Sequence, residues 1–148
     1  MTSNFRPILL VLALVGLPRA TPVAAAEVPT PESIVQTQLD AYNARDMEAF
    51  LATYADDAEL YNFPASLQTK GKAEMRKRYA VRFSDTILHA VITQHVAMGN
   101  TVIDHERIQV TLPEGPGVME AIAIYEVKDG KIVKVTFIYG PKLPGAKL

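Results

Sequence analysis

The feature that most constrains the fold is a change in hydrophobic period near residue 84. Before it, apolar residues recur at helical spacing, and after it they alternate with a period of two. The early half predicts three helices, over residues 31–45, 46–55 and 71–83, and one short strand over 59–63. The late half predicts four strands, over 86–98, 101–112, 118–127 and 131–139, with hairpin signals at Gly99-Asn100 and Asp129-Gly130.

This order of elements predicts an α+β fold. We expect a cone-shaped, curved, mixed but mostly antiparallel sheet packed against three N-terminal helices. Asp46 is placed to cap the second helix, and Asp56-Asp57 is expected to end it. A sheet that curls around helices makes one concave pocket, so the functional site is expected there.

The chain divides into three predicted parts. A basic residue, an apolar run over 8–17 and the sequence Val23-Ala-Ala-Ala26 are typical of a secretory signal peptide, here residues 1–26. The run is too short to span a bilayer, which needs roughly 20 residues, and its flanking prolines disfavour a buried helix. Residues 27–140 are expected to form one domain and 141–148 a loose C-terminal tail. We therefore expect an exported protein, periplasmic or extracellular.

Charge and cysteine content exclude several classes of function. Without Arg6 and Arg19 of the leader, the 15 basic residues fall to 13, against 16 acidic ones. A slightly acidic chain has no electrostatic reason to bind nucleic acid or an anionic membrane, so neither partner is expected. The basic residues between Lys70 and Arg82 are interpreted as a solvated helix face. The chain has no cysteine, which excludes disulfides and a thiol nucleophile.

Two segments resemble a known family. Residues 46–58, with Tyr54-Ala-Asp-Asp-Ala58, and the closing segment Asp129-Gly-Lys-Ile-Val-Lys-Val-Thr-Phe137 resemble the SnoaL-like, or nuclear-transport-factor-2-like (NTF2-like), superfamily, which has a ketosteroid isomerase-like fold. The resemblance covers residues 31–139. It implies the cone-shaped fold and its pocket, but no single chemistry, because the scaffold hosts enzymes, binding proteins and assembly modules.

The same resemblance implies that two known catalytic sets are missing. Aligned through residues 54–58, the base and the tyrosine of ketosteroid isomerases fall on Asn62 and Gln36, and counting back from the turn at Gly130 places their acid on Ala123. The asparagine of limonene-type epoxide hydrolases matches Asn62, but their two aspartates fall on Gln109 and Phe137. Enzyme status is therefore left open, with an isomerase- or lyase-type proton transfer as the enzymatic interpretation.

Two carboxylates interrupt an otherwise apolar face of the predicted strand over 102–110. If Asp104 and Glu106 both enter an apolar cavity, desolvation and mutual repulsion raise the pKa of at least one of them. A carboxyl group tuned toward neutrality can shuttle a proton, so both are candidate catalytic residues. Two alternatives stay open: a carboxylate paired with a neighbouring Arg or Lys, or a one-residue slip that turns His105 and Arg107 inward.

Two histidines on the preceding strand do not predict a metal site. His89 and His95 share a face, but six residues of extended chain separate them by roughly 20 Å. Each is better explained by an ordinary hydrogen bond. We therefore predict no metal and no cofactor.

Aromatic and polar side chains are expected to line the pocket. The candidate substrate-binding residues are Tyr42, Asn62, Phe63, Tyr125 and Phe137. An apolar cavity with a few polar groups is the usual form of a small-molecule site, so the expected partner is a small apolar molecule.

An isoleucine patch is predicted on the opposite face of the sheet. It would combine Ile122 and Ile124 of one strand with Ile132 and Ile138 of the next. Such an exposed patch usually marks an interface, and the resemblance implies pairing through this face. A homodimer is therefore predicted.

Two functions fit these observations. The first is an exported, cofactor-free domain that performs isomerase- or cyclase-like acid/base chemistry on a small molecule, using the strand carboxylate pair. The alternative is a non-catalytic module for small-ligand binding or dimeric interaction. A pure interaction module would have a filled cone without a cavity.

Overall fold

The computed structural model describes residues 28–148. The signal peptide predicted over residues 1–26 lies outside the described residues. The elements follow the order α1, α2, β1, β2, α3, β3, β4, β5 and β6. The predicted sequence of early helices and late strands is therefore confirmed, with one strand more than expected.

The helices begin where the local chemistry favours a helix start. They are α1 (Pro31–Ala44), α2 (Met47–Ala52) and α3 (Lys72–Phe83). The hydroxyl of Thr30 accepts a hydrogen bond from the backbone N–H of Ser33 at 3.2 Å and caps α1. Asp46 caps α2 as predicted, accepting from the backbone N–H of Ala49 at 3.0 Å. Gly71 precedes α3 with a φ of +79°, a conformation that other residues rarely adopt.

The strands form one six-stranded sheet in the order β2-β1-β6-β5-β4-β3. They are β1 (Tyr54–Asn62), β2 (Ser66–Lys70), β3 (His89–Met98), β4 (Thr101–Leu112), β5 (Gly115–Lys128) and β6 (Lys131–Pro144). Among these six strands of residues 28–148, only β1 and β6 pair in parallel. Asp129 and Gly130 both have positive φ, as a tight hairpin turn between β5 and β6 requires. The predicted mixed, mostly antiparallel sheet is confirmed.

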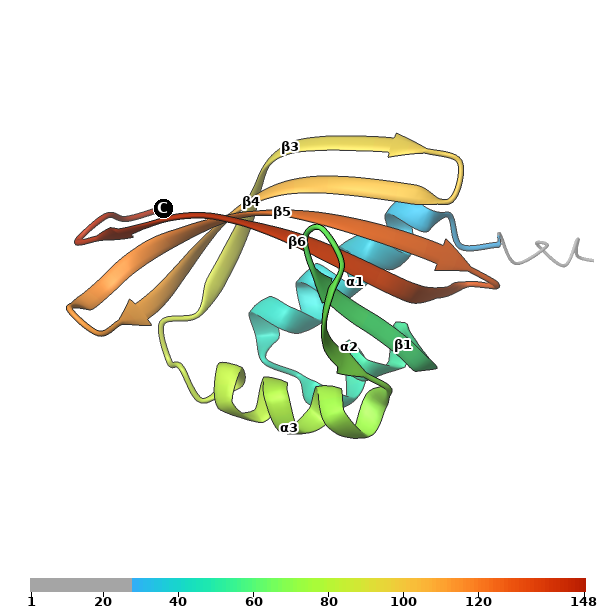
Figure 1. Ribbon diagram of the computed structural model, residues 1–148, viewed down its shortest axis with the longest axis horizontal. Coiled ribbons are helices and arrows are strands. Elements are labelled where there is room, and N and C mark those ends of the chain that lie inside the picture. Colours follow the sequence, from blue (N-terminus) through green and yellow to red (C-terminus); the bar gives the residue numbers. More distant parts are fainter. Residues whose placement is uncertain (1–27) are drawn as a thin grey trace, which may run out of the picture.

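The sheet and the helices form two layers. Figure 1 shows the long strands β3–β6 curving across the molecule, with all three helices on one side of them. The core lies between these layers. Phe50 is fully buried at its centre, with its ring centroid 4.4 Å from that of Tyr79 and 5.1 Å from that of Tyr54. The α+β cone is thus closed by aromatic packing beneath the sheet.

The first hairpin differs from the prediction. Strand β1 begins at Tyr54 rather than Glu59, and β2 was not predicted at all. Asp56 and Asp57 lie within β1 instead of ending a helix. The pairing register of β1 with β6 shifts between Tyr54 and Glu59, and Asp56 reaches solvent there to pair with Lys72 at 2.8 Å. An irregular, solvated strand lacks the alternation of apolar and polar residues from which a strand is predicted.

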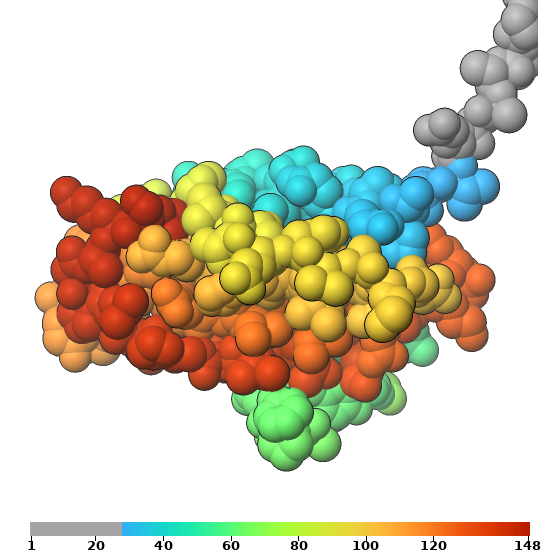
Figure 2. Space-filling model, turned by 90° about the horizontal axis from the view of Figure 1, so that it is seen from above, coloured from blue at the N-terminus to red at the C-terminus, as the bar shows by residue number. Residues whose placement is uncertain are grey.

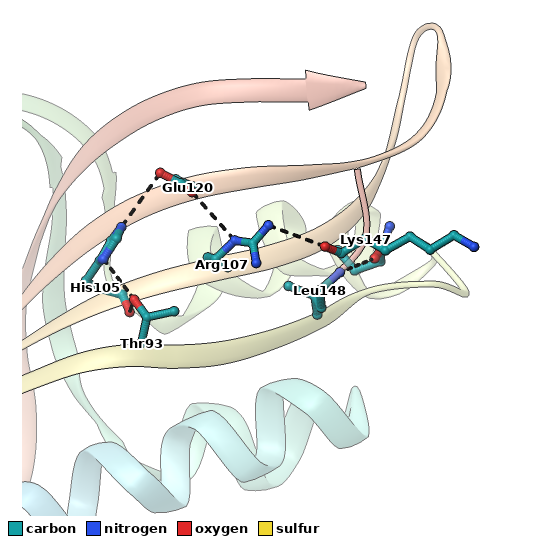
Figure 3. Close-up of polar contacts among 7 residues, drawn as sticks. Thr93, His105, Arg107, Glu120, Lys147 and Leu148 are labelled. Carbon is teal, nitrogen blue, oxygen red and sulfur yellow. Dashed lines mark hydrogen bonds and ion pairs between the residues drawn. The ribbon is translucent and has the colours of Figure 1, made fainter. Parts of the chain in front are cut away.

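The C-terminal segment is ordered, whereas a loose tail was predicted. Strand β6 runs to Pro144, and its last residues pair with β5. The chain then contacts the outer face of β4 (Figure 3): Arg107 Nη2 donates to the carbonyl of Lys147 at 3.3 Å. The backbone N–H of Leu148 donates to Gln109 Oε1 at 3.3 Å. These contacts join residues about forty positions apart in sequence, so local composition did not indicate them.

The outer face of the sheet carries the predicted isoleucine patch, with one correction. In Figure 2 this face is seen from above, and α1 shows only along one edge of the strands. Ile138 is exposed there, and Ile122 and Ile124 are half-buried. Ile132, however, is fully buried in the core. The register of β5 with β6 shifts after Glu126, so a bulge turns this end of β6 to the other face.

Candidate functional site

Strand β4 alternates as predicted. Asp104 and Glu106 are buried beneath the sheet, whereas His105 and Arg107 are only half-buried and belong to the outer face. On that face both basic side chains approach Glu120 (Figure 3): His105 Nε2 lies 3.8 Å from Glu120 Oε2, and Arg107 Nε lies 3.5 Å from Oε1. The alternative register, with His105 and Arg107 inside, is thereby excluded.

Glu106 lines a cavity of about 490 Å³ between the helices and the inner face of the sheet. We call this cavity the Glu106 pocket. Helices α1 and α3 form one side of it, and strands β3 to β6 form the other. Much of its wall is apolar, including Leu39, Ile108, Met119 and Ala121. The pocket therefore offers a desolvating environment to any charged group on its wall.

The Glu106 carboxyl group has a strongly shifted pKa in this pocket. Its Oε1 accepts a hydrogen bond from the Tyr125 hydroxyl at 2.9 Å. Burial raises the pKa of Glu106 to about 7; the charge of Asp104 adds to this effect, while the Tyr125 hydrogen bond and the charge of Arg82 oppose it. Near neutral pH both protonation states are populated, so Glu106 can accept a proton as well as donate one.

Tyr42 supplies a neutral donor on the same cavity. Arg82 Nε donates to the Tyr42 hydroxyl oxygen at 2.9 Å. Burial raises the pKa of Tyr42, against the opposing charge of Arg82, so the hydroxyl stays protonated at neutral pH. Because this oxygen is the acceptor toward Arg82, its own proton remains for an acceptor in the pocket.

Asp104 lies in a different place. It lines a second hollow, between the start of α1 and strands β3 and β4, which we call the Asp104 hollow. Its Oδ1 is 2.6 Å from Nδ1 of the half-exposed His95. Burial raises the pKa of Asp104, and the hydrogen bond and charge of His95 oppose that rise. The two predicted catalytic carboxylates share a strand face but line separate cavities.

Three of the five predicted substrate-binding residues line the Glu106 pocket: Tyr42, Tyr125 and Phe137. The other two do not. Asn62 ends β1, and its Oδ1 accepts a hydrogen bond from Gln68 Nε2 of β2. Phe63 is 61% exposed in the connection that follows. The backbone of Asn62 pairs with Phe137 of the pocket wall, but the side chain of Asn62 is taken up by Gln68 in the unpredicted β1–β2 hairpin. A binding role stays a prediction for all five.

Sequence reading missed four polar residues of the pocket wall, which are Gln38, Arg78, Arg82 and Lys142. For three of them, helical spacing indicated a position near an inward-facing tyrosine. Gln38 stands four residues before Tyr42 on α1, and Arg78 and Arg82 flank the inward-facing Tyr79 on α3. The basic residues of α3 were instead interpreted together as a solvated face. Lys142 was assigned to the loose tail.

Among residues 28–148, no group of three His, Cys, Asp or Glu side chains is arranged to hold a metal ion. In the same part of the chain, no helix has both the length and the apolar character needed to cross a membrane.

Solved structures resemble this fold closely. An uncharacterized cystatin fold protein from Novosphingobium aromaticivorans is 24% identical, with a TM-score of 0.67, over 74% of this chain and 97% of that one. An NTF2-like protein of unknown function from Cytophaga hutchinsonii is 14% identical, with a TM-score of 0.64, over 79% and 96%. SalBIII, an epoxide hydrolase/cyclase-like enzyme described in pyran ring formation in salinomycin, is 16% identical, with a TM-score of 0.67, over 74% and 90%.

At these identities the likeness shows the fold alone. A comparison with curated protein sequences gave no significant match. The family model of the SnoaL-like domain matches residues 35–135, from the first helix to the last strand of the sheet. The chain therefore belongs to the SnoaL-like domain family, within the NTF2-like superfamily.

Proposed function

We propose that this protein is an acid/base catalyst acting on a small apolar molecule, and that Glu106 transfers the proton. One observation carries the proposal: a buried carboxyl group on the wall of an apolar cavity, with its pKa raised to about 7. A general base is most effective when its pKa lies near the working pH. The family gives general support, because SalBIII shares the fold and is described as epoxide hydrolase/cyclase-like.

The reaction needs two proton transfers. Ionised Glu106 takes a proton from an acidic C–H or O–H group of the bound molecule and becomes neutral. Its Oε1 is held by Tyr125, which leaves Oε2 for the substrate. The Tyr42 hydroxyl and the Arg82 guanidinium stabilise the negative charge that develops on the molecule. Glu106 then returns the proton to a different atom, which completes an isomerisation or a ring closure.

Glu106 alone transfers the proton, and not the predicted pair of Asp104 and Glu106. Asp104 is bound to His95 in its own hollow. It acts on the reaction only through its charge, which raises the pKa of Glu106. Asp104 is therefore a residue that tunes the base.

The alternative is a protein that binds a small molecule in the Glu106 pocket without reaction. The unmatched isomerase positions at Asn62, Gln36 and Ala123 favour it. Both functions use the same cavity, so its geometry does not distinguish them. A measured reaction rate does.

Kemp elimination of 5-nitrobenzisoxazole tests the proposal directly. This apolar probe needs only a base: the base removes the ring C–H proton, the N–O bond breaks, and the oxygen leaves as a coloured phenolate. We expect the wild-type rate to rise as pH increases through about 7, because only ionised Glu106 accepts the proton. Glu106→Gln should lower the rate by at least about 100-fold.

Asp104→Asn is the matched control, since it removes a neighbouring buried carboxylate outside the pocket. It should retain most of the rate and shift its pH dependence to lower pH. A wild-type rate equal to that of Glu106→Gln would contradict acid/base catalysis and leave ligand binding as the function.

We also propose that the protein is exported, with cleavage before Glu27.

We further propose a homodimer formed through the outer face of the sheet. The exposed Ile138 with the half-buried Ile122 and Ile124 supports the dimer. Light scattering should give a dimer mass that Ile138→Lys reduces to a monomer mass. Val28→Lys, at an exposed apolar residue outside the sheet, should leave the mass unchanged.

A further inference from the structure

Helix α3 carries basic residues on two sides, and the two sets differ in their partners. Three cations pair with carboxylates: Lys72 with Asp56 at 2.8 Å, Arg76 with Glu48 at 2.5 Å, and Lys77 with Glu74 at 2.6 Å. Arg78 and Arg82 instead line the Glu106 pocket. Within residues 28–148, neither has a carboxylate oxygen within 4.0 Å. Within the described chain, the cations of α3 that point away from the pocket are thus paired with carboxylates, whereas those at the pocket make no direct ion pair.

A third cation reaches the cavity from the sheet. Lys142 of β6 lines the pocket, and no ion pair within the described residues involves it. Asp85 forms no ion pair with these three cations, although the charge of Arg82 contributes to the lowered pKa of Asp85. Its two oxygens accept hydrogen bonds from Thr111 and from the backbone of Ile87. Glu106 is then the one acid on the wall of this pocket in the described chain.

Arg82 is held in place for binding. It is half-buried, and its Nε is fixed by the hydrogen bond to Tyr42. A guanidinium has five N–H donors in a planar fork that matches a carboxylate, so its terminal amino groups remain for a ligand. The apolar wall beside it, with Ile108 and Met119, suits a hydrophobic body.

We infer that the Glu106 pocket selects molecules that carry a carboxylate beside an apolar body. Arg82 binds the carboxylate, and Arg78 and Lys142 attract it at the mouth. This inference rests on the proposed use of the pocket for a small molecule and is independent of catalysis.

The charge of the pocket makes this binding depend on pH. The groups that face the cavity are Glu106, the tyrosines 42, 79, 125 and 139, and the cations Arg78, Arg82 and Lys142. Burial raises the pKa of Tyr42, Tyr79 and Tyr125, so these three stay neutral. Glu106 gains its charge as pH rises through about 7, and that charge repels an anion. Affinity for a carboxylate should therefore fall over this range.

The test uses two probes of matched shape, 2-naphthylacetate and the neutral 2-naphthylacetamide. Calorimetry gives the affinities, and the methyl NMR signals of Ile108 and Met119 report whether the probe enters the pocket. At pH 6 the carboxylate should bind at least about tenfold more tightly than the amide, as a charge-assisted hydrogen bond provides. Arg82→Gln should remove most of this preference, and Lys142→Gln, at an exposed residue, should reduce it without affecting the core.

Arg76→Gln is the matched control, because it removes a cation from the same helix that is already paired with Glu48. It should keep the full preference. Equal affinity of the two probes for the wild type, or an unchanged preference in both Arg82→Gln and Lys142→Gln, overturns the inference but leaves a small-molecule pocket. If neither probe shifts the Ile108 and Met119 signals, the pocket does not bind molecules of this kind and the inference is overturned, while the Kemp elimination rates still decide the proposed function.

Discussion

Asp104 and Glu106 stand two residues apart on the same face of β4, yet they occupy different chemical environments. Asp104 is bound to a half-exposed imidazole in an open hollow. Glu106 is bound to a buried phenol in an apolar pocket. Burial raises the pKa of both carboxyl groups. The hydrogen-bond partner that opposes this rise is an imidazole, which can carry positive charge, at Asp104 and a neutral phenol at Glu106, where the charge of Arg82 also opposes it.

The difference comes from the neighbouring strands. On β5, Ala123 lies opposite Asp104 and Ala121 lies opposite Glu106, so both carboxylates have space beside them. On β3, His95 lies opposite Asp104, whereas an apolar residue, Ile92, lies opposite Glu106. A cross-strand histidine gives one carboxylate a hydrogen-bond partner, and the lack of one opposite the other leaves it a candidate base.

The largest expected effect is on stability at alkaline pH. The pKa of Glu106 is about 7 in the folded protein against an ordinary value of 4.5, so the folded state binds more protons between these values and loses stability as pH rises. The difference corresponds to about 3 kcal/mol. Glu106→Gln removes this loss. Urea unfolding should show the variant gaining about 2 to 3 kcal/mol over wild type between pH 5 and pH 8, since part of the loss is already present at pH 5.

The matched variant Asp104→Asn should show a smaller pH-dependent gain, because His95 opposes the pKa rise at that site. Acids whose pKa is lowered, such as Glu59 and Asp85, act in the other direction and below the pH range of this comparison. Their contributions to the unfolding free energy are also the same in wild type and variant, so they cancel in the difference. A difference in unfolding free energy that does not change with pH would show that Glu106 is not desolvated.

The next effect concerns the partner of Asp104. His95→Ala leaves a buried carboxylate without its hydrogen bond, which should cost about 2 kcal/mol of unfolding free energy at pH 8. The pKa of Asp104 should rise further, and carboxyl NMR titration measures it. His89→Ala, at an exposed histidine of the same strand, should change stability by less than about 0.5 kcal/mol. Equal costs for the two variants would show that the contact between His95 and Asp104 does not stabilise the fold.

The smallest effect concerns the partner of Glu106. The Tyr125 hydrogen bond stabilises the ionised carboxylate, so Tyr125→Phe should raise the pKa of Glu106 by about one pH unit. Carboxyl NMR titration measures the change. Tyr139→Phe alters another phenol on the same pocket that makes no hydrogen bond to Glu106, and it should leave the pKa of Glu106 in place. If both variants titrate like wild type, the phenol does not hold the carboxylate.

Much of the fold could be predicted because its signals are local. The cap at Asp46, the turn at Asp129-Gly130 and the alternation of β4 depend on neighbouring residues, and the structure reproduces each of them. The failures share a cause. Each depends on a second strand: β2 pairs with β1 through a shifted register, the C-terminal segment contacts the distant strand β4, and Ile132 turns inward at a bulge in the pairing of β5 with β6.

The candidate site divides in the same way. Helical spacing placed Tyr42 on the inner face of α1, and alternation placed Glu106 beneath the sheet. Neither pattern could show that Arg82 of α3 meets Tyr42, since forty residues separate them. The β1–β2 hairpin, after which Phe63 stands exposed, was equally invisible, because its pairing register shifts between Leu60 and Tyr61.

The sequence by itself determined that Asp104 and Glu106 share one face of a strand, because the period of an extended strand is a local property. The structure shows that this face is the inner one. Only the tertiary structure decided that they have different roles. The pairing register of β3 with β4 shifts between Ile92 and Gln94, and that shift brings His95 opposite Asp104. An irregularity in pairing is a property of two strands and their packing together, so neither strand records it alone.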